Sequence, residues 1–319
     1  MLRYIVKRIM AAAPLLCLVC VLCFTLIQLA PFDAIDMLAR PDMSAEVIEA
    51  IKVREGLDKP GYLQFFHWLK RMVSGDLGYS IVNHQSVALG LASRLPNTLV
   101  LVLPSYAFAV SLAVILGLIA GSSEGSRLDK FIDGFCSIGM ATPTFWIGLI
   151  LIYICSYRLN LFPVLGMYTV GMEPNLADAL RHLTLPWITL IIAFLPDMVR
   201  YVRSSAIGQW REDYVMVQKA FGASKKEILF RHVIKNVLLP VITLVGMSLP
   251  MLITGAFITE SIFSWPGVGV YFLTAIQAFD YPIVMAITLF SSIMVILGNL
   301  LADICYGLAD PRIKTVRSN

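Results

Sequence analysis

The chain has 319 residues, of which 58% are hydrophobic and only 14% are charged, and its mean hydropathy is +0.78. Several apolar runs exceed the roughly 20 residues that cross a bilayer as a helix, which excludes a pair of water-soluble domains. The formal net charge of +4 is small for this length and offers no argument for nucleic-acid binding.

The apolar runs predict an all-α, polytopic membrane protein that forms a single membrane domain. We place six transmembrane helices near residues 9–31, 98–121, 131–156, 183–201, 236–258 and 283–308. The fourth has the weakest pattern, because Pro186 and Pro196 interrupt it and Asp197 ends it. The first is longer than the roughly 7–15-residue apolar core of a signal peptide, so we expect it to stay uncleaved.

Lysine and arginine are distributed unevenly between the segments that connect the predicted spans. With the N-terminus inside, the cytoplasmic segments hold sixteen basic residues, eight of them between Arg200 and Lys235. The outside segments after the third and fifth spans hold only Arg158 and Arg181. Because short basic segments stay in the cytoplasm, we predict cytoplasmic termini and a cytoplasmic loop over 200–235.

The segment 32–97 is predicted to be an extracytoplasmic insertion. Ser44 is placed to cap a short amphipathic helix over 45–53, and Gly75–Gly78 is typical of a turn. The stretch from Tyr62 to Leu69 is rich in aromatic residues, which suits an interfacial or partner-facing helix. A small self-packed cap and a direct contact with a partner both remain open for this insertion.

The residues that usually carry chemistry form no catalytic or metal-binding pattern. Cys17, Cys20 and Cys23 have a spacing similar to an iron–sulfur ligand run, but they lie inside an apolar span, where cysteine packs as a small hydrophobe. There is no G-x-x-x-x-G-K-[ST] motif for nucleotide, and the four histidines are scattered. We therefore predict no catalytic residue, metal site or cofactor in this chain.

The predicted spans contain acidic residues near their ends and small residues and prolines in their interior. We expect water to reach the acids near span ends, which are Asp133, Asp197, Glu260 and Asp303. Small residues and prolines recur over 139–143 in the third span and over 248–255 in the fifth. Ordinary helix packing and a pathway that opens and closes are both compatible with these two segments.

A polar segment between the fourth and fifth spans predicts a helix, a glycine stop and a second helix. Asp213 is placed to cap the first helix, and Gly222 suits the left-handed position just beyond its end. Ser224 and Glu227 form an S-x-x-E capping box for the second helix. The apolar residues Tyr214, Val217 and Phe221 recur at helical spacing, which favours docking into a partner groove over binding to lipid headgroups.

The segment before the last span predicts a tight turn on the outside face. Pro266 and Gly267 favour a turn, and Trp265 is expected to anchor it at the membrane interface. Taken alone, this pattern is also compatible with an ordinary loop.

Several segments, taken together and in order, resemble the permease subunits of ABC-type oligopeptide, dipeptide and nickel importers, and the resemblance covers essentially the whole chain. The long first outside loop resembles the permease type that pairs with a second, different permease. The segments that carry the resemblance are Tyr4–Ile9 with Pro14, Gly56–Pro60, Gly75–Gly78, Leu95–Thr98, Asp213–Gly222, Arg231–His232, Asn236–Pro240, Phe263–Gly267 and Asp310–Arg312.

The resemblance implies a type I ABC importer permease fold and a role for the polar segment. In that family the segment is the EAA loop, which couples the permease to a cytoplasmic ATPase. The name-giving positions are Met216, Val217 and Gln218 here, and Pro31–Ala34 departs from the usual Pro-Gly-Asp-Pro. The implied coupling residues are Asp213, Tyr214, Val217, Gln218, Ala220, Phe221, Gly222, Ser224 and Glu227, with Trp265, Pro266 and Gly267 in the outside turn.

The resemblance further implies a subunit that is not itself an enzyme and that sits in the inner membrane of a prokaryote. It would form half of a peptide channel with a second homologous permease, two ABC ATPase subunits that bind ATP and Mg, an extracytoplasmic substrate-binding protein and membrane lipid. Import of nickel or another small chelate is the alternative for the same architecture. An ion-driven secondary transporter would need inverted repeats and buried ionisable groups in broken spans, which the sequence does not show.

Overall fold

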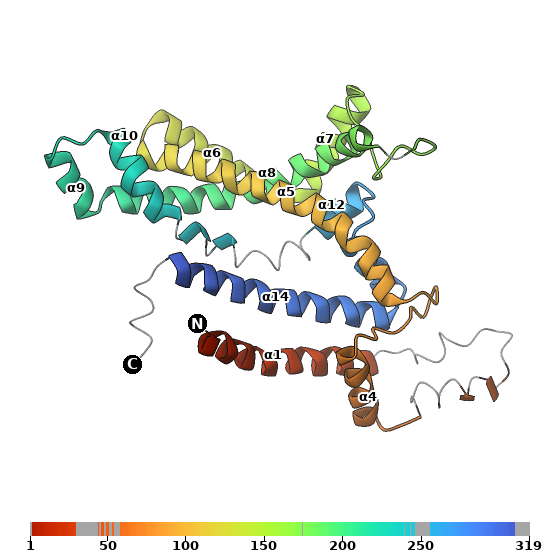
Figure 1. The fold of residues 1–319 in the computed structure, drawn as a ribbon. Helices are drawn as coiled ribbons and strands as arrows, with labels where there is room; N and C mark the ends of the chain where they lie inside the picture. Colours follow the sequence, from red (N-terminus) through yellow and green to blue (C-terminus); the bar gives the residue numbers. More distant parts are fainter. Residues whose placement is uncertain are drawn as a thin grey trace. The chain divides into compact units, whose positions relative to one another are not determined.

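The computed structural model describes residues 2–29, 58–173, 175–238, 240–242, 244–245 and 256–309, together with isolated positions between 44 and 53. Within these ranges the chain is helical, and the only β pairing is an isolated bridge between Tyr79 and Ser86. The helices are α1 (Leu2–Gln28), α4 (Gly61–Val73), α5 (Val87–Ser122), α6 (Arg127–Ala141), α7 (Thr144–Leu151), η1 (Ile152–Arg158), α8 (Leu176–Trp210), α9 (Asp213–Ala220), α10 (Lys225–Ile228), η2 (Leu229–Val233), α12 (Phe257–Ile262), α13 (Val268–Gln277) and α14 (Tyr281–Ala309) (Figure 1).

The all-α, membrane-spanning prediction is confirmed. Among the described residues, α5, α8 and α14 are long and apolar enough to cross a bilayer, and α6 with Thr144–Arg158 forms a fourth candidate that bends by 98°. Helix α1 covers the predicted first span and contains a shorter apolar stretch, Pro14–Thr25. Most of the predicted fifth span, 236–258, lies outside the described residues, so the count of six is compatible with the structure but not fixed by it.

Helix α8 extends beyond the predicted fourth span, 183–201, at both ends. Asp197 does not end it, since α8 continues from Leu176 to Trp210 with both Pro186 and Pro196 inside. A proline in a helix loses one backbone hydrogen bond, and neighbouring helices must accommodate its ring. Gly139 of α6 does so, because a Cβ there would lie 2.6 Å from Cγ of Pro196.

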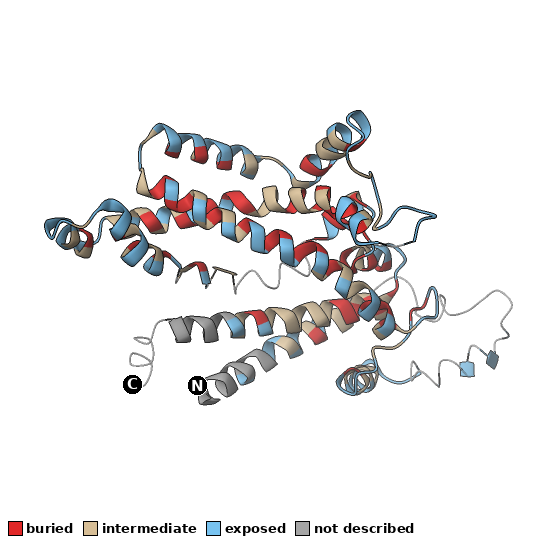
Figure 2. Cartoon of the chain, turned by 45° about the horizontal axis from the view of Figure 1, so that its top comes forward, coloured by how far each residue is buried: buried red, intermediate tan, exposed pale blue. Residues whose placement is uncertain are grey.

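The chain forms two compact units, one of residues 1–96 and 270–296 and one of residues 97–269 and 297–319. In the second unit, α6 and α8 pack along each other, and buried residues recur along α8 at helical spacing (Figure 2). Their facing charges pair near one end. Asp129 accepts two hydrogen bonds from Arg203, at 2.5 and 2.8 Å, and Arg200 lies 3.3 Å from Asp133 and donates to Ser137 at 2.6 Å.

Helices α5 and α8 approach each other closely because glycines on α5 leave no side chain between them. A Cβ on Gly117 would lie 2.5 Å from Cβ of Val202, and one on Gly121 would lie 2.6 Å from Cβ of Ala206. This small-x-x-x-small pairing is a common way for membrane helices to bring their backbones together. Nothing in the sequence around Gly117 and Gly121 distinguishes them from other small residues in the predicted spans.

In the first unit, the aromatic residues of α4 divide between two faces. Phe65 and Trp68 pack against Phe24 of α1, with ring centroids 5.4 and 6.3 Å apart, whereas Tyr62 and Phe66 are exposed. The predicted helix therefore exists, and its Phe65 face is used inside the protein. This supports the self-packed interpretation for that face only.

The predicted turn at Gly75–Gly78 is confirmed, with both glycines at positive φ. Asp76 accepts a hydrogen bond from Arg71 at 2.8 Å and one from the backbone of Gly78 at 2.9 Å. The bond from the Arg71 guanidinium holds the pKa of the Asp76 carboxyl below its usual value. In the same unit, Ser80 donates a hydrogen bond to the buried Asp280, just before α14.

Candidate functional site

The segment 213–228 folds as the sequence predicts around its glycine. Helix α9 ends at Ala220, and the backbone amides of Gly222 and Ala223 donate to the carbonyls of Lys219 and Gln218, each at 3.0 Å. These two bonds form a Schellman motif, which needs a left-handed residue at the position of Gly222. Gly222 has a φ of +82°, as that motif requires.

Space plays no part in the requirement for glycine at this turn. A Cβ built on Gly222 would meet no atom within 4 Å. The backbone conformation alone therefore excludes most residues, since a side chain in the left-handed region costs about 1–2 kcal/mol. Asparagine is the exception, because it visits this region more readily than other residues with side chains.

One predicted cap is wrong, and the predicted capping box forms only through its serine. Asp213 is the first residue of α9 and does not cap it, since the capping position belongs to Glu212, whose side chain makes no capping bond. The hydroxyl of Ser224 caps α10 by accepting from the backbone amide of Glu227 at 3.2 Å. The Glu227 carboxylate pairs with Arg231 at 3.2 Å.

The apolar residues of α9 divide between a buried and an exposed face. Val215 is 1% exposed and packs in a cluster with Ile228 and Val233. On the exposed face, Met216, Val217 and Phe221 are 72%, 50% and 84% exposed. A charged segment thus presents three large apolar side chains that nothing in the described residues covers.

Tyr214 does not belong to this exposed face, although its spacing grouped it with Val217 and Phe221. Its hydroxyl donates to Oε1 of Gln209 at 3.1 Å, and its ring lies 5.9 Å from the ring of His232. Burial raises the pKa of the Tyr214 hydroxyl. Of the remaining predicted residues, Gln218 is half-buried, and Asp213, Ala220, Ser224 and Glu227 are exposed.

Contacts with the ends of α5 and α8 hold the segment in place. The Lys225 ammonium donates to the carbonyl of Ser122 and lies 5.7 Å from the centre of the Trp210 ring. Nε1 of Trp210 donates to the Ser122 hydroxyl at 3.0 Å, and Arg211 pairs with Glu124 at 2.8 Å. Ser122, the last residue of α5, therefore accepts hydrogen bonds from Trp210, which precedes α9, and from Lys225, which follows it.

The Trp265 turn, residues 263–268, is a fixed structure and not an ordinary loop. Trp265 is fully buried, and its Nε1 donates to the carbonyl of Asn97 at 2.9 Å. The amide of the Asn97 side chain donates in return to the carbonyl of Pro266 at 2.9 Å. The expectation that Trp265 anchors the turn by its ring at a membrane interface is wrong, because the ring is enclosed by protein.

A buried carboxylate lies behind this turn. Glu260 and Thr98 are both fully buried, and the Thr98 hydroxyl donates to Oε1 of Glu260 at 2.6 Å while it accepts from the amide of Val268 at 2.8 Å. The expectation that water reaches Glu260 is therefore wrong. A Cβ on Gly267 would lie 2.2 Å from Oε1 of Glu260, and one on Gly269 would lie 2.8 Å from Oε2, so the carboxylate occupies the space that the glycines leave.

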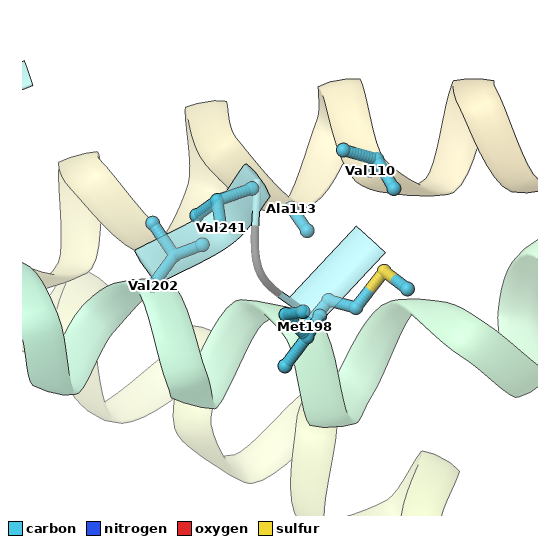
Figure 3. Close-up of a pocket in the computed structure, with 6 residues that line it drawn as sticks. Val110, Ala113, Met198, Val202 and Val241 are labelled. Atoms are coloured by element: carbon cyan, nitrogen blue, oxygen red, sulfur yellow. The ribbon is translucent and has the colours of Figure 1, made fainter. Parts of the chain in front are cut away.

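Among the described residues there is a small crevice, and there is no cluster of metal-binding side chains. A crevice of about 10 Å³ between α5, α8 and the side chains of Val241 and Leu244 is lined by apolar side chains (Figure 3). A space of this size holds at most about one water molecule. In the part of the chain that the structure describes, no group of three His, Cys, Asp or Glu residues is placed to hold a metal ion. The residues that line the crevice are Val110, Ala113, Met198, Val202, Val241 and Leu244.

Comparison with known proteins covers nearly the whole chain. Residues 113–315 match the family described as binding-protein-dependent transport system inner membrane component, and residues 1–102 match its N-terminal region. The chain is 38% identical over 315 residues to the oligopeptide transport system permease protein AppB of Bacillus subtilis, covering 98% of this chain and 100% of that protein.

Two further relatives have similar coverage. A putative peptide permease protein of Brucella suis is 35% identical over 317 residues, which is 98% of this chain and 99% of the relative. The glutathione transport system permease protein GsiC of Escherichia coli K12 is 33% identical over 314 residues, again 98% of this chain and 99% of the relative. With its apolar spans and this match along its length, the chain belongs to the binding-protein-dependent transport system inner membrane components, the permease subunits of ABC importers.

Proposed function

We propose that this chain forms half of the translocation channel of an ATP-driven peptide importer. Its coupling role is supported by the exposed apolar face of α9, which is formed by Met216, Val217 and Phe221. The backbone hydrogen bonds and the neighbouring residues hold this segment in place. Three large apolar side chains that are exposed beside the charged residues of this segment fit a groove on a partner protein better than they fit water.

The partner at this face is one of two cytoplasmic ATPase subunits. They bind ATP and Mg, and this chain contributes no catalytic group and binds neither ligand. A second, homologous permease completes the channel, and an extracytoplasmic binding protein delivers the substrate. ATP-driven closure of the ATPase pair moves the 213–228 segment, and the spans alternate between an outward-facing and an inward-facing arrangement.

The proposed orientation places both termini and the 213–228 segment in the cytoplasm and the Trp265 turn outside. The eight basic residues between Arg200 and Lys235 support it, because Lys and Arg near span ends favour the cytoplasmic side. The region 259–282, which contains the Trp265 turn, holds no Lys or Arg.

Peptides are the substrate class that the relatives favour. Their names refer to oligopeptide, peptide and glutathione transport. Nickel or another small chelate is the alternative on the same architecture. In this proposal selection lies largely with the binding protein, so that the permease contributes a path and not a specific pocket.

The test is uptake in cells that lack this chain. Deletion should abolish import of labelled di-, tri- or oligopeptides, plasmid-borne wild-type protein should restore it, and labelled nickel uptake should not change. A complex purified through a tag on this chain should contain an ATPase with a nucleotide-binding P-loop. Unchanged peptide uptake together with lost nickel uptake would reject the peptide proposal, and the absence of an ATPase would reject the importer proposal altogether.

A further inference from the structure

Helix α5 connects the two sites described above. At Asn97 and Thr98, where the second unit begins, α5 holds the Trp265 turn. At Ser122, its last residue, α5 holds the 213–228 segment. The helix is continuous between them. At 1.5 Å per residue, Thr98 and Ser122 are about 36 Å apart along the helix axis.

The donor and the acceptor of each hydrogen bond at the Trp265 turn can be assigned. A threonine hydroxyl has one proton, and the amide of Val268 donates to Thr98 Oγ1, so that proton is the one given to Glu260. The side-chain amide and the carbonyl of Asn97 bond Pro266 and Trp265 in opposite directions. Four hydrogen bonds thus join one helical turn of α5 to a segment more than 160 residues later.

There is little room for this joint to slip. Thr98, Glu260 and Trp265 are each fully buried, and Gly267 and Gly269 pack directly on the Glu260 carboxylate. Packed protein interiors of this kind move as blocks, because small displacements cause overlaps. A buried acceptor that loses its donor costs about 1–3 kcal/mol, so the bonds are not exchanged freely during movement.

The part of α5 near Ser122 is held by its packing on α8. Gly117 and Gly121 let the two backbones approach closely there, and the ion pairs between α6 and α8 lie along the same part of α8. Pro104 lies between Thr98 and Ser122 and removes one backbone hydrogen bond from the helix, so α5 is held by its packed contacts and not by its backbone alone. Through these contacts a displacement at Ser122 is passed along the helix toward Thr98.

We propose that Thr98 and Glu260 are positioning residues that fasten the Trp265 turn to α5, so that α5 carries movement of the 213–228 segment to that turn. This inference rests on the proposed function, in which the 213–228 segment contacts the ATPase and the turn faces outside. It assigns a transport role to Glu260, whose side chain is remote from the ATPase face.

The test compares variants on α5 in the complete reconstituted importer with its binding protein. Thr98→Val removes both hydrogen bonds of the hydroxyl and keeps the shape of the side chain, whereas Thr98→Ser keeps both bonds. Ser105→Ala is the matched control, because Ser105 is also a buried α5 hydroxyl but bonds only carbonyls of its own helix, those of Leu101 and Val102.

We expect Thr98→Val to assemble and hydrolyse ATP at the basal rate but to lose at least ten-fold in stimulation by peptide-loaded binding protein. Thr98→Ser and Ser105→Ala should retain stimulation. Wild-type stimulation in Thr98→Val overturns the inference. Should Thr98→Val fail to assemble, Asn97→Ala is the deciding variant, because it removes only the hydrogen bond to Pro266. A several-fold loss of stimulation in Asn97→Ala supports the inference, and wild-type stimulation in that variant overturns it.

Failure of the inference is distinguishable from failure of the proposed function. Phe221→Asp acts at the ATPase face and does not touch the Trp265 turn. If Phe221→Asp loses stimulation while Thr98→Val and Asn97→Ala keep it, only the role of α5 is wrong. If Phe221→Asp itself keeps full stimulation and uptake, the proposed coupling face is wrong.

Discussion

Gly117 of α5 lies so close to Val202 of α8 that a Cβ added to the glycine would be 2.5 Å from Cβ of the valine and 2.9 Å from the carbonyl oxygen of Val199. Neither neighbour is the flexible end of a side chain. A substitution at Gly117 therefore forces the two helix backbones apart, and with them the helix that links the two sites.

Gly117→Ala should accordingly destabilise the protein. Overpacking in a well-packed core costs about 1–3 kcal/mol. Thermal unfolding of the purified protein in detergent, followed by size-exclusion chromatography, should show a lower melting temperature. The control is Gly134→Ala on α6, where an added Cβ meets nothing within 4 Å and helix propensity favours alanine. Equal melting temperatures for the two variants would show that α5 and α8 are not closely packed.

Gly222→Val should uncouple transport, because valine is strained at a φ of +82° and its substitution misplaces the exposed face of α9. Gly222→Asn should keep most of the activity, since asparagine adopts left-handed conformations and there is room for its side chain. The measurement is peptide-stimulated ATP hydrolysis by the reconstituted complex. Equal loss in both variants would mean that the small size of glycine matters at this turn and not its backbone freedom.

Met216→Asp and Phe221→Asp should weaken binding of the ATPase, because each places a charge on the apolar surface that we propose is buried against it. We expect less ATPase to copurify with each variant, by ten-fold or more. Tyr214→Phe is the control. It removes the hydrogen bond to Gln209, worth about 1 kcal/mol, on the face turned toward the bundle, and should leave ATPase binding unchanged.

Phe65→Ala and Phe66→Ala should separate the two faces of α4. Phe65 packs on Phe24, so its removal should lower the melting temperature by destroying an aromatic contact worth about 0.5–1.5 kcal/mol beyond its buried area. Phe66 is 61% exposed, and its removal should leave the melting temperature unchanged. If the exposed face receives the binding protein, Tyr62→Ala combined with Phe66→Ala should weaken docking measured in nanodiscs. Unchanged docking would favour a cap that serves stability alone.

Single cysteines should establish the orientation, in a background without the native cysteines. Val170→Cys, at a position 98% exposed between η1 and α8, should react with a membrane-impermeant thiol reagent on intact cells. Lys226→Cys, in the 213–228 segment, should react only after the cells are opened. Labelling of the Lys226 variant on intact cells would reject the proposed orientation.

The features that follow from neighbouring residues were predictable from the sequence. The helix–glycine–helix order, the left-handed Gly222 and the Ser224 cap all depend on residues within one or two helical turns. The bend of 98° in the third span falls between Ala141 and Thr144, within the segment 139–143 in which the sequence places small residues and a proline. The division of α9 into faces was only partly predictable, because helical spacing cannot tell which side Val215 anchors.

The features that depend on distant contacts were not predictable. Glu260 at a span end suggests access to water, and only its contact with Thr98, 162 residues earlier, shows that it is buried. Pro196 indicates an interruption of the fourth span, and only the space that Gly139 on α6 leaves for its ring shows how α8 accommodates it. The spacing from Glu260 to Gly267 and Gly269 was visible in the sequence, but without the fold it had no interpretation.

The way α9 is held has a consequence for the choice of partner. Its position depends on Val215, on the backbone bonds around Gly222 and on the contacts of Lys225 and Trp210, none of which involves the side chains of Met216 or Phe221. Those exposed side chains are therefore free to change without disturbing the fold. In the proposed complex, a few substitutions on one face of this short helix would therefore change which ATPase it recognises, and permeases with the same architecture would pair with different ATPases.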